Sequence, residues 1–536
     1  MGRRKNEGLG GRFFISSIIL LFSFCSLLTI PILAEERESI ELPEVVITGE
    51  DRSLLDREKK EEILFPEREK MDLEKESAKA LFPEGAVKHE RRYLEEKVPP
   101  SSFEIFYGSY NSLDYEFFHK QRIQEWNYLI NVGGASSGGF DWREEEISSL
   151  YSTSSTSRHS LKGEVYRYGE RWGIEGVADY GIKNSYLPYQ RRSEAISAGG
   201  IRLGGVMTIS PKIDLGIGIG FGGGDMRETN TTSTSSDLNL EFNTLVKELP
   251  VGIGVGREDF SINSKRIEIS NLFIQSKDLN LHPFSLDARV GIDHHHHGHN
   301  QELNLSLLLS FPWRDRTQIF LGCEKGMKNL SFEELYLETD YVTPNKDLRP
   351  VRMGEIKAGG SYRFTREAFF NLLLFVKDAK DYIVLEDEDR DYLYRPTNID
   401  ASIWGAQIEA KGYLTPYLIQ NSFLVYTTTK GDQEGKIVPF IPNWKANLLL
   451  KYFNGHGLEV ILNPEYVGQR QDGLWESTRK ELPGYLLVHA HLAQSFLNKN
   501  LTLFLYGKNL LAQNYLERWG YPGWPCTFGG GFNWKF

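Results

Sequence analysis

The C-terminal end of this chain places aromatic residues at alternate positions of one strand. Phe528, Phe532, Trp534 and Phe536 are separated by two or four positions, and Phe536 is the last residue. Because successive side chains of a β-strand point to opposite faces, these aromatics share one face. An aromatic face on the final strand is what a β-barrel of the bacterial outer membrane presents to lipid. The ending therefore predicts a membrane-spanning barrel.

The same two-residue period recurs far upstream, in 211–223, 237–243 and 301–311. In each segment, apolar residues alternate with Gly, Asn, Ser, Asp or Glu, so one face is apolar and the other is polar. A soluble β-sandwich of this length would need a large apolar interior, yet only 40% of the residues are hydrophobic. A barrel with lipid outside and a polar lumen uses such alternation along every strand.

The connections between these segments alternate in length. Short turns are expected, for example, at Gln121–Gln124 and Leu414–Pro416. Outer-membrane barrels have short periplasmic turns and longer outside loops, and the segments from 102 onward number about 22. The sequence therefore predicts an all-β fold, a transmembrane antiparallel β-barrel over 102–536 with both ends in the periplasm. The long polar outside loops are expected at 134–157, 224–236, 325–352, 385–400, 468–484 and 509–524.

Residues 1–34 have the features of a secretory signal peptide. Basic residues at 3–5 precede an apolar run over 13–33, and Ala34 ends that run before two glutamates. The run is also long enough to be an uncleaved anchor, which is the alternative interpretation. Export together with a barrel predicts the outer membrane of a Gram-negative-type bacterium as the location.

Several motifs in the second half of the chain match the sequence pattern of a known protein family. The matching residues are Phe332 to Tyr336, Asn345, Asp347-Leu348, Pro350, Lys377-Asp378, Asn398 to Glu409, Lys508 to Leu511 and Gly520 to Gly523. These residues are similar to the β-barrel of TonB-dependent outer-membrane receptors, and the resemblance covers roughly 102–536. It implies capture or transport of a small extracellular solute, with a metal complex as one candidate.

The segment before the barrel, 35–101, departs from that family. Its members normally carry a globular plug domain there, and 50–101 is too short and too charged to fold as one; it has the composition of a partly helical linker. Val45, Val46, Ile47 and Thr48 resemble the TonB box. The resemblance therefore implies binding of a TonB-type energy-coupling protein of the periplasm, by addition of an extended strand. The alternative is an extended N-terminal segment that binds no partner protein.

Something must narrow the lumen of so wide a barrel. The sequence leaves three candidates, which are the 35–101 segment, outside loops folded inward, and a separate plug or partner protein. Inward polar residues that would tune permeation by charge, or simply keep the interior wet, are Asp214, Glu241, Glu302, His489 and His491.

A histidine tract lies between two strong strands, in a connection expected at the outer surface. Neutral imidazoles bind transition metals, so the tract is a candidate metal-capture site, although neighbouring histidines cannot all converge on one ion. A polar surface loop is the alternative interpretation. The candidate ligands are His294, His295, His296, His297 and His299.

The remaining sequence features disfavour other functions. No nucleophile and base at catalytic spacing and no phosphate-binding glycine loop stands out, so neither an enzyme nor a resident cofactor is expected. The net charge of −11 without a basic stripe disfavours nucleic acid as a partner. Cys323 and Cys526, which remain after signal cleavage, either pair or stay free. The leading hypothesis is a receptor-like transport barrel; the alternatives are a surface adhesin or scaffold, or a passive porin-like pore.

Overall fold

The computed structural model describes most of the chain from Ser101 to the C-terminus. The predicted signal peptide, the TonB-box-like segment and the charged linker lie almost wholly outside the described residues. The described ranges are 101–138, 156–169, 171–187, 192–210, 213–226, 231–246, 249–262, 265–281, 283–295, 300–314, 316–328, 342–345, 347–365, 368–387, 394–431, 437–473, 480–518 and 521–536.

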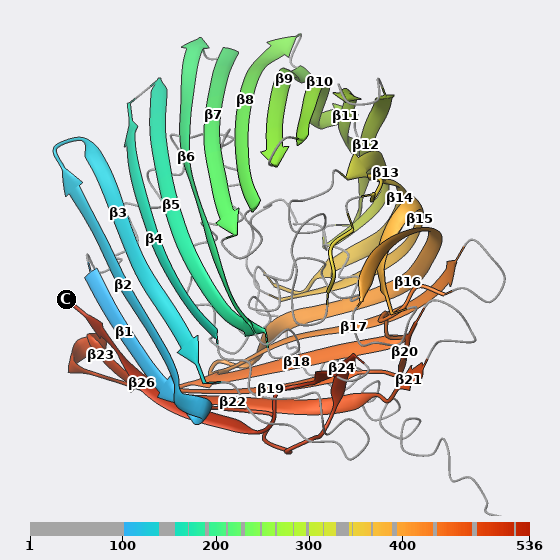
Figure 1. Ribbon diagram of the computed structural model, residues 1–536. Helices are drawn as coiled ribbons and strands as arrows, with labels where there is room; N and C mark the ends of the chain where they lie inside the picture. Colours follow the sequence, from blue (N-terminus) through green and yellow to red (C-terminus); the bar gives the residue numbers. More distant parts are fainter. Residues whose placement is uncertain are drawn as a thin grey trace, which may run out of the picture.

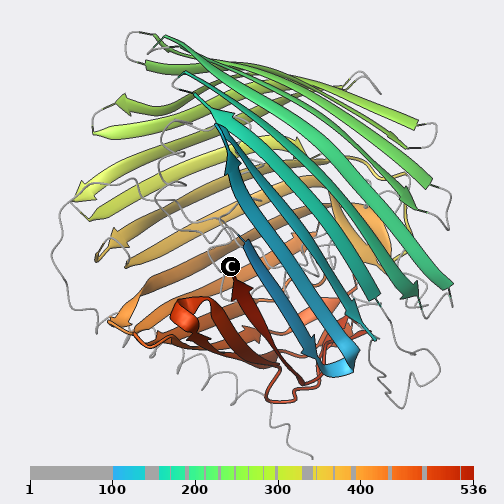
Figure 2. The same cartoon turned by 90° about the vertical axis from the view of Figure 1, so that its left-hand side faces the viewer.

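A single antiparallel sheet of 22 strands closes into a barrel, which confirms the predicted fold class and strand number. Figure 1 looks into the ring of strands, and Figure 2 shows their strong tilt from the side. The first half of the ring consists of β1 (Ser101–Gly108), β2 (Ser112–Ile123), β3 (Trp126–Ser137), β4 (Thr156–Tyr168), β5 (Trp172–Leu187), β6 (Arg192–Ser210), β7 (Ile213–Met226), β8 (Thr231–Val246), β9 (Leu249–Ile262), β10 (Lys265–Leu281) and β11 (Phe284–His295).

The second half continues the same up-and-down order. It consists of β12 (Asn300–Arg314), β13 (Thr317–Lys328), β14 (Val351–Arg363), β15 (Phe369–Glu386), β16 (Arg395–Thr415), β17 (Leu418–Gly431), β18 (Trp444–Phe453), β19 (Leu458–Val467), β22 (Tyr485–Phe496), β23 (Leu501–Lys508) and β26 (Thr527–Lys535). Two small hairpins lie outside the ring order, β20 (Arg470–Asp472) with β21 (Lys480–Leu482) and β24 (Leu516–Arg518) with β25 (Tyr521–Pro522).

Helical structure in the described part of the chain is confined to two single turns, η2 (Ser109–Asn111) and η3 (Leu497–Lys499). None of the helices among the described residues is long and apolar enough to cross a membrane.

The barrel closes where β1 pairs with β26. Their register places Phe106 opposite Gly531, and the same glycine lies opposite Phe504 of β23 on its other side. The backbone N–H of Phe536 donates to the carbonyl of Ser101 at 3.0 Å, so the two ends of the barrel meet at one rim. Closure leaves no free sheet edge, which a membrane-spanning sheet requires.

The predicted alternation is confirmed, because the apolar positions of the period-two segments lie on the outer face. Ile217, Leu240 and Leu303 are 44%, 44% and 48% exposed, as lipid-facing side chains of an isolated barrel must be. Phe528 and Trp534 of the last strand are exposed on this face, and Phe536, which follows the strand, is also exposed.

In the second half of the barrel, the connections alternate between a short-turn end and a long-loop end, as predicted, although the long connection at 432–443 was not predicted. In the first half, the outside connections other than that between β3 and β4 have four residues or fewer, and the loop predicted at 224–236 is wrong. The segment 224–236 is mostly strand, since β7 runs to Met226 and β8 begins at Thr231. Its Ser and Thr residues pair across strands above the apolar belt, and Thr234 Oγ1 lies 2.6 Å from Ser261 Oγ. β-branched and hydroxyl side chains fit a pleated surface, so polarity alone does not make this stretch a loop.

Candidate functional site

Five outside connections meet in one apolar cluster at the long-loop end of the second half of the barrel. Its buried members are Val342, Tyr394, Phe440 and Leu482, and we call these four residues the mouth cluster. They come from the β13–β14, β15–β16, β17–β18 and β19–β22 connections, and Leu516 of the β23–β26 connection packs against them. Loops that share a buried core hold a fixed surface, so this part of the mouth is preorganised.

Residues 437–443, which we call the inward segment, fold against the inner wall of the barrel. Val438 and Ile441 pack with Leu373, Phe375 and Ile403 in one buried cluster. The positions next to Leu373 on its strand are exposed on the lipid face, so this cluster lies on the lumen side. An outside loop folded inward was one of the three sequence candidates for narrowing the lumen, and the structure shows such a loop.

Backbone hydrogen bonds fix the inward segment in place. The N–H of Phe440 donates to the carbonyl of Gln471 at 2.8 Å, and the N–H of Thr427 donates to the carbonyl of Asn443 at 3.0 Å. Phe440 has a φ of 64°, in the left-handed region that costs a non-glycine residue free energy. The surrounding contacts compensate this cost, since the Phe440 ring lies 5.7 Å from that of Tyr394.

Two polar contacts join the connections around the mouth cluster. The buried hydroxyl of Tyr394 donates to Asp472 Oδ2 at 2.8 Å. Nη2 of Arg470 donates to the carbonyls of Leu516 at 2.5 Å and Glu517 at 3.0 Å. Arg470 is only 6% exposed, so this guanidinium ties the β20–β21 hairpin to β24 rather than projecting into water.

Residues picked out by the family resemblance form a second link between loops. Asn398 Nδ2 donates to the carbonyl of Arg349 at 2.9 Å, and Asn398 Oδ1 accepts from the Arg349 N–H at 2.8 Å. Asn345 Nδ2 donates to the carbonyl of Pro396 at 2.9 Å. Arg349 also forms an ion pair with Asp381 at 2.6 Å. The asparagines of the motif therefore attach the β13–β14 connection to β16.

The five predicted lumen residues occupy inward positions of their strands. Asp214, Glu241, Glu302 and His491 each lie next to an exposed apolar residue, and His489 lies two residues from His491 on the same face. Glu241 is buried and accepts a hydrogen bond from Gln275 at 2.5 Å. His491 is buried beside Phe504, with 5.8 Å between the ring centroids. These two side chains therefore pack within the wall.

The histidine tract is only partly within the described residues. His294 and His295 end β11 at the long-loop end, whereas His296, His297 and His299 lie outside the described part. Of the five candidate side chains, the structure describes only that of His294. Among the described residues, no group of three or more His, Cys, Asp or Glu is placed to hold a metal ion. Cys323 and Cys526 are free.

Sequence reasoning missed the residues that organise the mouth, namely Tyr394, Phe440, Arg470 and Asp472. They stand in the connections between barrel strands as isolated residues, with no extended periodicity around them. Their roles depend on partners such as the Tyr394–Asp472 pair, which is separated by 78 residues. Only the motif residues Asn345 and Asn398 carried a signal, and that signal came from the family resemblance.

Solved structures with the same fold include siderophore and iron receptors. The ferric enterobactin receptor PfeA of Pseudomonas aeruginosa, as a double mutant, aligns with a TM-score of 0.66 at 13% identity, over 81% of this chain and 80% of that chain. The siderophore receptor PirA of Acinetobacter baumannii gives 0.67 at 12% identity, over 82% and 81%. The FrpB iron transporter of Neisseria meningitidis gives 0.67 at 12% identity, over 82% of each chain.

Sequence comparison gives the family directly. No match is found among curated protein sequences. The model of the TonB-dependent receptor-like β-barrel matches residues 99–510, which is most of the barrel described above. This protein is therefore a member of the TonB-dependent receptor-like β-barrel family, an outer-membrane barrel of 22 strands.

Proposed function

We propose that this protein binds a small extracellular solute at the mouth of the barrel and carries it across the outer membrane. The supporting observation is the mouth cluster, which packs five outside connections into one preorganised surface. A pore that only lets solutes diffuse has no need for such a surface, whereas a binding site gains affinity when its loops are ordered in advance.

The proposed solute class is a metal chelate, and an iron chelate is the first candidate. The similar solved structures are described as receptors for ferric enterobactin and other siderophores or as an iron transporter. At 12–13% identity, this likeness supports the fold and only suggests the solute.

Transport against a gradient requires coupling to the energised inner membrane. We propose that Val45, Val46, Ile47 and Thr48 add as an extended strand to a periplasmic protein of TonB type. Signal cleavage after Ala34 would leave this segment near the start of the mature chain, followed by the charged linker. A separate plug protein remains a candidate partner that would complete the closure of the lumen.

The test is uptake of radioactive iron chelates by cells that produce this protein as their only receptor. We expect uptake that stops when a protonophore collapses the inner-membrane gradient. Uptake should also stop when Val45, Val46 and Ile47 are changed to proline, because proline cannot donate a ladder hydrogen bond. The control variant carries prolines at Leu54 and Leu55 and should transport normally.

Other outcomes would select the alternative functions. Uptake that persists with the protonophore and with the proline variant would indicate a passive pore. Absence of uptake for every chelate, together with cell attachment that depends on the outside loops, would indicate an adhesin or scaffold.

We further propose that the tract from His294 to His299 captures transition-metal ions before transport. Calorimetric titration of the purified barrel with Zn²⁺ and Ni²⁺ should give micromolar binding that disappears when the five histidines are changed to serine. Equal heats from both proteins would show that the tract is only a polar loop.

A further inference from the structure

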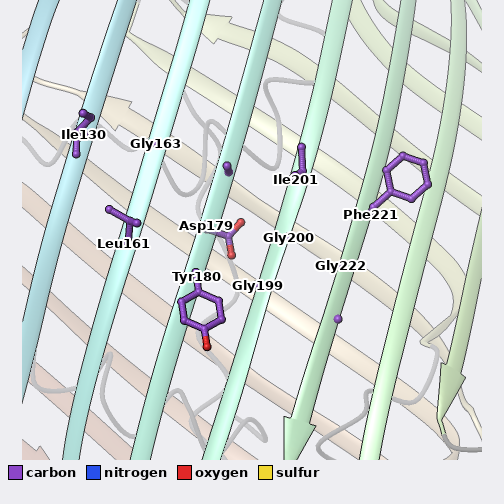
Figure 3. A pocket seen from close by; sticks show the side chains of 12 residues that line it. Ile130, Leu161, Gly163, Asp179, Tyr180, Gly199, Gly200, Ile201, Phe221 and Gly222 are labelled. Atoms are coloured by element: carbon purple, nitrogen blue, oxygen red, sulfur yellow. The ribbon is translucent and has the colours of Figure 1, made fainter.

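The outer wall of the barrel has a shallow hollow across β3 to β7, of about 730 Å³ (Figure 3). Its rim is formed by apolar side chains that point away from the lumen. These side chains are Ile130, Leu161, Tyr180, Ile201 and Phe221, which are 39%, 51%, 48%, 54% and 61% exposed. The hollow therefore opens toward the membrane.

The strand register explains how the hollow arises. One cross-strand row runs Ile130, Gly163, Ala178, Ile201 and Phe221, so its second and third positions are small. A Cβ added at Gly163 would meet no atom within 4 Å. The lack of large side chains at Gly163 and Ala178 therefore creates the space.

The next row toward the long-loop end also has glycines, and therefore no side chains, on one side. It runs Leu161, Tyr180, Gly199 and Gly223. A Cβ at Gly199 would lie 2.9 Å from Tyr180 Cδ2, which shows that the tyrosine ring leans over this glycine. Leu161 and Tyr180 therefore bound the hollow on one side. Gly199 and Gly223 form an edge that carries no side chains.

The depth of the hollow in the membrane follows from β5. Trp172 stands at the short-turn end of this strand, and Tyr180 lies eight residues further along. At about 3.3 Å per residue and a tilt near 40°, Tyr180 lies about 20 Å above Trp172, close to the top of an apolar belt about 25 Å tall. A tyrosine at this level keeps its hydroxyl at the membrane interface and its ring in the hydrocarbon.

We infer that the hollow holds one acyl chain of an outer-leaflet lipid, whose polar end lies at the level of the Tyr180 hydroxyl. The hollow lies within the lipid-facing belt, and its lining is apolar apart from Asp179 and the Tyr180 hydroxyl, so lipid chains are what surround it. A chain seated there contacts strand backbone at Gly163, where no side chain covers it. This binding is independent of the transported solute.

The test is native mass spectrometry of the mature protein in mild detergent, titrated with a phospholipid that has two saturated chains. Gly163→Phe should fill the hollow and raise the Kd for the lipid about tenfold, a change equivalent to 1.4 kcal/mol. Gly354→Phe is the matched control, since Gly354 also faces outward with no atom within 4 Å of an added Cβ. It should bind lipid like the wild type.

A second variant and a folding assay test whether misfolding causes any loss of lipid binding. Ala178→Phe fills the same row from the neighbouring strand and should also reduce lipid binding, and heat-modifiable migration on a gel shows that each barrel has folded. The inference is overturned if a folded Gly163→Phe or Ala178→Phe barrel binds the lipid like the wild type, or if the wild type binds none. It is also overturned if the wild type forms dimers that Gly163→Phe abolishes, because a second copy would then be the occupant.

Discussion

Changing Gly531 to valine should prevent the barrel from closing. A Cβ at this position would lie 2.1 Å from the carbonyl oxygen of Ile105 and 2.8 Å from Phe504 Cζ. The first contact is with backbone of β1, so a rotamer change cannot relieve it, and the seam between β1 and β26 must separate. An unclosed sheet exposes unpaired N–H and C=O groups to lipid, each of which costs several kcal/mol. We therefore expect almost no folded protein in the outer membrane.

The measurement is the fraction of heat-modifiable protein in membrane extracts. Gly354→Val provides the control for placing a β-branched residue at a strand glycine, because an added Cβ there meets no atom within 4 Å. It should fold to nearly the wild-type level. Normal amounts of folded Gly531→Val protein would show that the seam opens and repacks more easily than its geometry indicates.

Replacing residues 437–442 with a glycine-serine linker should raise the single-channel conductance of the barrel severalfold. This part of the inward segment places Val438 and Ile441 on the inner wall and Phe440 in the mouth cluster. Without these anchors, a flexible linker has no apolar surface that holds it in the lumen. The cross-section open to ions should increase, which planar-bilayer recording measures directly.

The control replaces residues 227–230, which join β7 and β8 at the same end of the barrel, and should leave conductance unchanged. A rise in both variants would reflect general loosening of the mouth. Unchanged conductance after replacement of 437–442 would place the obstruction in another loop, in the 35–101 segment or in a separate protein.

The barrel could be predicted from sequence because its signal is local. A period of two in segments such as 301–311 reports which side chains face lipid, and closure requires only that each strand pairs with the next. The same local reasoning failed at 224–236, where Thr and Ser extend β7 and β8 beyond the apolar belt. The polar residues there reflect exposure of the strand ends to water, and they do not indicate whether the backbone is strand or loop.

The mouth could not be predicted, because its contacts join loops that are far apart in the chain. Nothing near Phe440 indicates that it packs beside Tyr394, and nothing near Arg470 indicates that it binds carbonyls of β24. Such partners are fixed only when the barrel brings the loop bases together. The asparagines at 345 and 398 were recognised through the family resemblance, and the structure supplies their physical role.

The hydrogen bond between Phe536 and Ser101 also has a consequence for the segment that precedes the barrel. It fixes the point from which residues 35–100 depart, at the rim of the lumen on the short-turn side. Attachment to the barrel makes binding of that segment to the lumen an intramolecular event, so its occupancy does not depend on how dilute the protein is. Weak affinity between that segment and the lumen would therefore suffice for occupancy, and a periplasmic protein that competes for the segment would act as a switch.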